Sequence, residues 1–113
     1  MRHLASAVLV ALLTLPAQAE SRGTRIAMAV ALLDVAGDQC GGLVQVDEGV
    51  KKTLYEHFHE YDIAGLASIL SRPLNAFYED FTYEAKQSRK AFCRHAPVIA
   101  ASTGYPVFTA GGD

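Results

Sequence analysis

Apolar positions along this chain fall into four groups that are spaced for helices. In the first group, residues 26–33 are wholly apolar, and the run ends near Gly37 and Asp38. Its Ala and Leu content favours a helix over a strand, so we predict a helix over roughly residues 24–36. A helix that is apolar all round belongs at the centre of a bundle.

The second group mixes apolar and charged positions with a helical period. Its apolar members recur at intervals of three and four residues: Val50, Leu54, Phe58 and Tyr61. Asp47 is placed to cap this helix, and Glu48 lies in its first turn. Asp62 is placed to cap a third, short helix over residues 63–70.

The last apolar stripe is the longest and covers five turns. Its members are Leu74, Phe77, Tyr78, Phe81, Ala85, Ser88 and Phe92. Proline is tolerated only in a first turn, so Pro73 predicts where this helix begins and Pro97 where it ends. Residues 102–113 have no period and predict a flexible tail, and no pair of strands competes with the helices. The predicted fold class is all-α, a small four-helix bundle.

Residues 1–19 have the pattern of a cleaved signal peptide. Arg2 and His3 precede a short apolar stretch over residues 4–15, and small residues follow, up to a cleavage site after Ala19. The stretch is shorter than the about 20 apolar residues that cross a membrane. We therefore expect an exported protein, periplasmic or extracellular, with a helical domain over residues 20–101 and no membrane anchor after cleavage.

Export determines what the two cysteines, Cys40 and Cys93, can do. A mature domain of about 90 residues has a small core, and an oxidising compartment lets the two thiols pair. We predict a disulfide that stabilises the fold by about 4 kcal/mol through the loop it closes. Two free thiols, an intermolecular disulfide and half of a metal site are the alternatives.

Three histidines, His57, His59 and His95, are the residues closest to a chemical motif in the mature chain. Residues two apart on a helix point in nearly opposite directions, so His57 and His59 cannot hold one ion from a regular helix, and no metal site or cofactor is predicted. All three can take up protons between about pH 7 and pH 5, which makes them candidate pH-responsive residues. No serine lies in a Gly-x-Ser-x-Gly turn, so we predict no catalytic residues and no enzyme.

Two further sets of residues are candidates for binding a partner. Four basic residues are spaced along one face of the last predicted helix: Lys86, Arg89, Lys90 and Arg94. The helix dipole alone explains cations near a C-terminus, but the stripe also suits an acidic partner or an anionic ligand. Tyr55 and Tyr83 fall near the edges of their apolar stripes and are placed to line a groove.

The net charge limits the class of partner. The chain has 10 Lys and Arg against 12 Asp and Glu, a formal charge of −2, so nothing draws it to nucleic acid. We expect a non-enzymatic protein that binds another exported protein as a partner, an inhibitor or a chaperone. A carrier of a small ligand or metal that uses His57, His59 and His95 is the alternative.

In profile, the chain resembles groups of small exported helical proteins of bacteria, among them the periplasmic acid-stress chaperones. The resemblance rests on the signal peptide, the mature length of about 90 residues and the single disulfide. It implies a chaperone-type function but assigns no role to an individual residue.

Overall fold

Four helices and one small sheet make up the part of the chain that the structure, a computed structural model, describes. This part comprises the backbone of residues 2–111 and the side chains of residues 21–111. The elements follow one another as α1 (Arg2–Gln39), β1 (Val44–Val46), α2 (Glu48–Ile63), α3 (Ala67–Gln87), α4 (Arg89–Ser102) and β2 (Phe108–Ala110). The fold class is the predicted one, a small all-α bundle with one disulfide.

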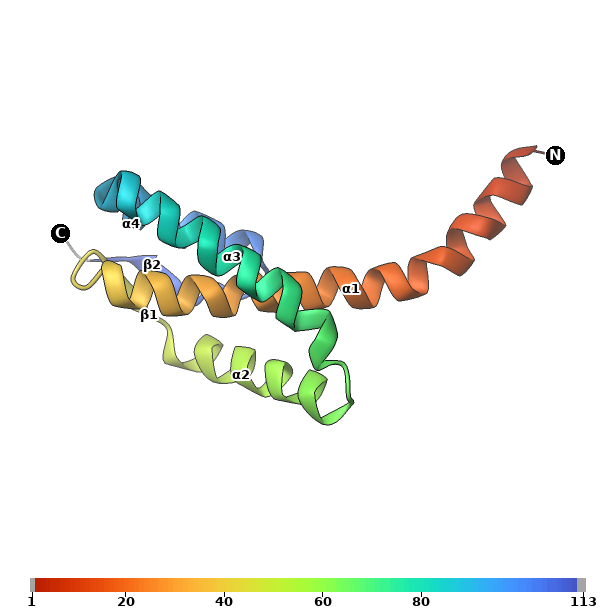
Figure 1. Ribbon diagram of the computed structural model, residues 1–113, viewed down its shortest axis with the longest axis horizontal. Coiled ribbons are helices and arrows are strands. Elements are labelled where there is room, and N and C mark those ends of the chain that lie inside the picture. Colours follow the sequence, from red (N-terminus) through yellow and green to blue (C-terminus); the bar gives the residue numbers. More distant parts are fainter. Residues whose placement is uncertain (1, 112–113) are drawn as a thin grey trace.

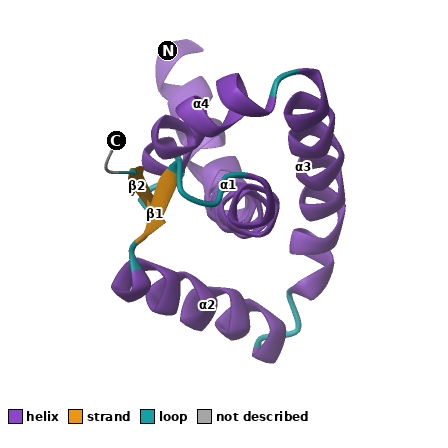
Figure 2. Ribbon diagram, turned by 90° about the vertical axis from the view of Figure 1, so that its left-hand side faces the viewer, coloured by secondary structure: helices purple, strands orange, loops and turns teal. Residues whose placement is uncertain are grey.

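The second half of α1 is the centre of the core (Figure 1). Figure 2 looks along α1 and shows α2, α3 and α4 arranged around it. Ile26 and Leu32 are completely buried, as are the alanines between and after them. The predicted central helix is therefore confirmed, although it extends beyond the predicted residues 24–36 at both ends.

The predicted signal peptide, residues 1–19, lies outside the residues whose side chains are described, and its cleavage after Ala19 stays a prediction. Within the described part of the chain, no helix is long and apolar enough to cross a membrane. Export and the periplasmic location remain proposals with which the fold is compatible.

Small side chains on one face of α1 allow other helices to approach it closely. Gly23, Ala27 and Ala31 follow one another at intervals of four residues, and all three are buried. A Cβ atom at Gly23 would lie 2.9 Å from Cγ2 of Ile69 in α3 and 3.3 Å from Cε2 of Tyr61 in α2. The close packing at this point therefore depends on glycine.

Helix α2 begins as predicted and ends differently. Asp47 accepts a hydrogen bond from the backbone N–H of Val50 at 3.0 Å, which confirms it as the N-cap. The predicted short helix over residues 63–70 is wrong, because α2 continues to Ile63 and a turn follows. Gly65 adopts a φ of +76°, and the N–H of Leu66 donates to the carbonyl of Tyr61, which is a Schellman ending.

The long fourth helix of the prediction is two helices. Pro73 does not start α3 and Pro97 does not end α4, since each lies inside its helix. A proline removes only its own amide from the helical ladder, and buried neighbours on both sides of each proline hold the helix against the core. The chain instead breaks at Ser88, which is extended with φ −159° and ψ 99°.

A two-stranded antiparallel sheet closes the fold, although no strands were expected. β1 pairs with β2 in a register that sets Val46 opposite Phe108. Residues 102–111 also differ from the expected flexible tail, because Val107 and Phe108 are buried in the core, while residues 112 and 113 lie outside the described residues. The N–H of Gly111 donates to the carbonyl of Leu43 at 3.1 Å. Strands of three residues are too short to show a period in the sequence.

Candidate functional site

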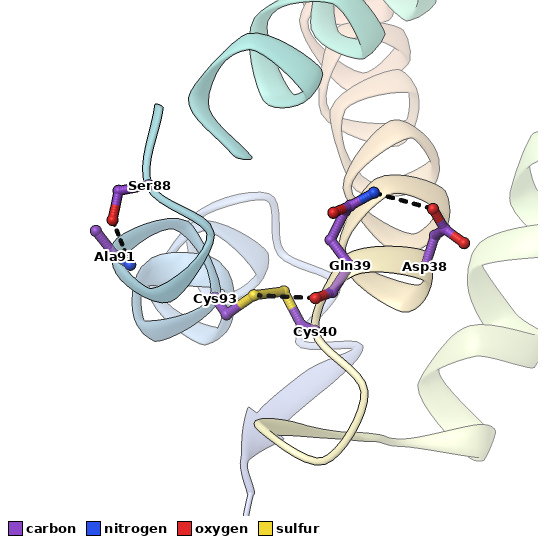
Figure 3. The surroundings of a disulfide bond; sticks show 6 residues. All are labelled: Asp38, Gln39, Cys40, Ser88, Ala91 and Cys93. Atoms are coloured by element: carbon purple, nitrogen blue, oxygen red, sulfur yellow. Dashed lines mark hydrogen bonds between the residues drawn. A yellow bond between two sulfur atoms is a disulfide. The ribbon is translucent and has the colours of Figure 1, made fainter. Parts of the chain in front are cut away.

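The disulfide joins the end of α1 to α4 (Figure 3). Cys40 directly follows α1, Cys93 lies in α4, and their Cα atoms are 5.4 Å apart. Both cysteines are buried in the core. The predicted pairing within one chain is therefore confirmed, and the bond fixes where α4 lies across the end of the central helix.

The helix break at Ser88 divides the predicted basic stripe between two helices. The hydroxyl oxygen of Ser88 accepts a hydrogen bond from the backbone N–H of Ala91 at 3.2 Å, so Ser88 is the N-cap of α4 (Figure 3). Lys86 consequently lies in the last turn of α3, whereas Arg89 and Lys90 lie in the first turn of α4. The prediction of one continuous basic stripe along one helix is wrong.

We call these four basic residues the basic corner: Lys86, Arg89, Lys90 and Arg94. All four side chains are exposed. The salt bridges among the described side chains join Arg22 to Glu60 and Lys51 to Glu48, so none involves this corner. The first turn of α4 contains no acidic residue. Cations at a helix N-terminus are unfavourable, so the dipole explains Lys86 but not the cations that begin α4.

The outer face of α4 continues the basic corner with an apolar residue. Lys90, Arg94 and Val98 follow at intervals of four residues and share one side of the helix, and Val98 is 67% exposed. A shallow hollow of about 380 Å³ lies between the end of α3 and α4. It is lined by Glu84, Gln87, Ser88, Ala91, Phe92, His95 and Ile99.

The two candidate tyrosines are not in one groove. Tyr55 is 40% exposed and lines a hollow of about 640 Å³ made by residues of α2 alone. Tyr83 is on α3 and is 64% exposed. The structure therefore does not bring Tyr55 and Tyr83 together.

Asp34 is a polar contact point that the sequence did not reveal. The hydroxyl of Tyr78 in α3 donates a hydrogen bond to Oδ2 of Asp34. Burial raises the pKa of the Asp34 carboxyl, and the charge of Lys51 partly opposes this shift. Burial, followed by the charge of Asp34, raises the pKa of Tyr55. The carboxyl thus interacts with both α2 and α3, through residues far from it in the sequence.

The three histidines lie in different surroundings. Nδ1 of His57 is 2.6 Å from the hydroxyl oxygen of Tyr105, whereas His59 lines the hollow on α2 and His95 the hollow beside α4. No group of three or more His, Cys, Asp or Glu that could hold a metal ion occurs among the residues described. A carrier site that uses all three histidines together therefore has no geometric support.

Comparisons with models of known protein families, with curated proteins and with solved structures found no match to this chain. Of the candidate residues, Arg89, Lys90 and Arg94 share α4 with the exposed Val98. Lys86 lines a separate hollow of about 420 Å³ between α1 and α3, together with Asp34 and Asp38.

Proposed function

We propose that the chain is an exported, non-enzymatic protein that binds an acidic surface of another protein through the basic corner and the outer face of α4. The observation that carries this proposal is the position of Arg89 and Lys90 in the first turn of α4, where no salt bridge among the described side chains pairs them. Electrostatic attraction to an acidic partner accounts for both cations at once.

The energetic argument concerns the cost of this arrangement to the fold. A cation in the first turn of a helix destabilises it by about 0.3–1 kcal/mol, and α4 begins with two. Acidic residues at the same positions would stabilise the helix by a similar amount. Exposed residues that lower the stability of their own helix are typical of a surface that binds another molecule.

The composition of the surface suits a protein better than a small ligand. Val98 provides an exposed apolar centre next to Lys90 and Arg94, and such apolar centres with charged rims are common in protein interfaces. Arginine is among the residues that contribute most to binding energy there. The proposed surface extends along α4 from Arg89 to Val98, and a shallow hollow of about 380 Å³ lies beside it.

The disulfide supports the exported part of the proposal. Cys40 and Cys93 pair within a small core, and such bonds persist in oxidising compartments outside the cytosol. The acid-stress-chaperone type of function remains a narrower form of the same proposal, in which His95 lies in the hollow beside α4.

The test is the double variant Arg89→Glu/Lys90→Glu, because it separates folding from binding. Its free energy of unfolding in urea should rise by about 1.2–4 kcal/mol, since each change removes an unfavourable cation and adds a favourable anion at the helix N-terminus. The wild type should retain a specific acidic protein from the exported fraction, and purified partner should bind the variant at least about tenfold more weakly. Arg72→Glu, an exposed change on α3, is the matched control.

Two results would contradict the proposal. If the double variant is less stable than the wild type, the two cations contribute to the fold itself. If the variant binds the same partner as tightly as the wild type, or if the Arg72→Glu control weakens binding equally, then the basic corner is not the binding surface.

A further inference from the structure

A second hollow, of about 540 Å³, lies along the flank of α2. Helix α1, helix α2 and the segment after α4 all contribute to its walls. The lining residues are Arg22, Arg25, Asp47, Gly49, Val50, Thr53, His57, Thr103, Gly104, Tyr105 and Pro106. The surface described above is on α3 and α4, so this hollow is a separate site.

Two guanidinium groups from one side of α1 line this hollow. Arg22 lies with its Cζ 5.9 Å from the centre of the Tyr61 ring, and its Nη2 is 4.0 Å from Oε2 of Glu60. Both members of that ion pair are exposed, so the pairing is weak. Arg25 donates a hydrogen bond to the Ser21 hydroxyl at 3.2 Å and has no carboxylate partner among the described residues. Both groups are oriented but retain positive charge.

His57 adds a third donor from the opposite helix. Its Nδ1 lies 2.6 Å from the hydroxyl oxygen of Tyr105, and the two rings meet edge to face at 5.5 Å between centroids. The ring can carry its proton on either nitrogen, and the tautomer in which the Tyr105 hydroxyl donates to Nδ1 leaves an N–H at Nε2 for a ligand.

Two carboxylates bear on the charge of the hollow. Glu60 lies beside Arg22 but is not part of the lining, and Asp47, the one carboxylate in the lining, lies away from the basic end. Asp47 precedes His57 by almost three turns of α2, which is about 15 Å along the helix axis. Its Oδ1 already accepts the N–H of Val50. The hollow is therefore basic where Arg22, Arg25 and His57 line it, while Val50 and Pro106 provide apolar wall.

We propose that this hollow binds the phosphate group of a phosphate monoester between Arg22, Arg25 and His57. Guanidinium groups donate paired hydrogen bonds to phosphate oxygens, and three cationic or N–H donors suit a group with three terminal oxygens. The volume exceeds that of a phosphate group alone, so the organic part of the ester lies along Val50, Thr53 and Pro106. The site does not depend on the protein-binding function proposed above.

The test measures binding of three probes to the full chain by calorimetry: inorganic phosphate, phenyl phosphate, and vesicles of phosphatidic acid in phosphatidylcholine. Phenyl phosphate should bind once per chain and more tightly than inorganic phosphate, because its ring contacts the apolar wall. Vesicle binding without phenyl phosphate binding would identify the source of the ester as a lipid headgroup. Sodium chloride at equal ionic strength separates specific binding from screening.

Arg25→Gln should weaken binding of the probe at least about tenfold, since it removes a charged donor pair. Arg25→Lys should restore part of the affinity and shows that the loss is not a folding defect. Arg72→Gln, on α3 and outside the hollow, should bind as the wild type does. The proposal is overturned if neither phenyl phosphate nor the vesicles bind, if chloride has the same effect, or if Arg25→Gln binds unchanged.

Discussion

The buried part of α1 and the helix α4 use their sequences in opposite ways. In α1, residues 26–33 are apolar, and all but the half-buried Met28 are buried in the core. In α4, Phe92 and Ala96 face the core, but the first turn carries cations that oppose the helix dipole, and Val98 is exposed. Folding alone therefore explains residues 26–33 of α1, whereas it does not explain the exposed half of α4.

Removing the bond between these two regions should have the largest effect. The double variant Cys40→Ser/Cys93→Ser releases α4 from the end of α1 and should lose about 4 kcal/mol, because the unfolded chain is no longer restrained. The melting temperature should fall by more than about 10 °C, measured by circular dichroism. Free thiols in the natively produced wild type, detected by Ellman titration, would contradict the disulfide.

Weakening the contact between α3 and α4 should have the next largest effect on stability. The ring of Phe81 lies 5.9 Å from Phe77 and 5.9 Å from Phe92, measured between centroids, and Phe81 is buried. Phe81→Ala should cost about 3–5 kcal/mol in urea unfolding, since it leaves a cavity between the two helices. Tyr83→Ala, on the exposed side of α3, should change stability by no more than about 0.5 kcal/mol. Equal losses would mean that the buried face is assigned incorrectly.

Two glycines of α1 test how closely other helices pack on it. Gly23→Ala places a methyl group 2.9 Å from Cγ2 of Ile69 and should cost about 1–3 kcal/mol. Gly37→Ala meets nothing within 4 Å on an exposed turn and should stabilise the helix by about 0.5–1 kcal/mol. Urea unfolding of both variants measures the two changes in stability. If both variants are more stable than the wild type, α1 is less closely packed at Gly23 than the structure indicates.

The smallest expected effect is the pH dependence of Asp34. The pKa of Asp34 is raised in the folded chain, so the native state binds more protons than the unfolded state near and above pH 3.8. The free energy of unfolding therefore falls as the pH rises through that range. Asp34→Asn keeps an acceptor for the Tyr78 hydroxyl and should remove this fall in stability. The gain in stability at neutral pH should be only about a few tenths of a kcal/mol, because the Asp34 side chain is largely solvated.

Urea unfolding at pH 3 to 7 measures this effect. Tyr78→Phe is the control, since it removes the donor and should therefore increase the loss of stability toward neutral pH. A variant Asp34→Asn with the same pH profile as the wild type would show that another group causes the dependence.

Local patterns were sufficient where the interaction itself is local. The apolar run of α1 predicted a central helix, and Asp47 beside the start of an amphipathic stretch predicted its cap. Two further local signals mark the helix ends that were predicted incorrectly: Gly65 after α2 and Ser88 before α4 are residues that commonly end and begin helices. The helix boundaries predicted at Pro73 and Pro97 were wrong because packing of the neighbouring residues on the core outweighed the low helix propensity of proline.

By itself, the sequence determined the helical class and the central position of α1, and it favoured a pairing of Cys40 with Cys93 that the packed helices then made. Only the tertiary structure decided that β1 pairs with β2, that Tyr78 donates to Asp34, and that His57 meets Tyr105 in a basic hollow. The physical reason is distance along the chain. Caps and helical periods depend on neighbours within a few residues, whereas these contacts join residues that only the packed helices bring together.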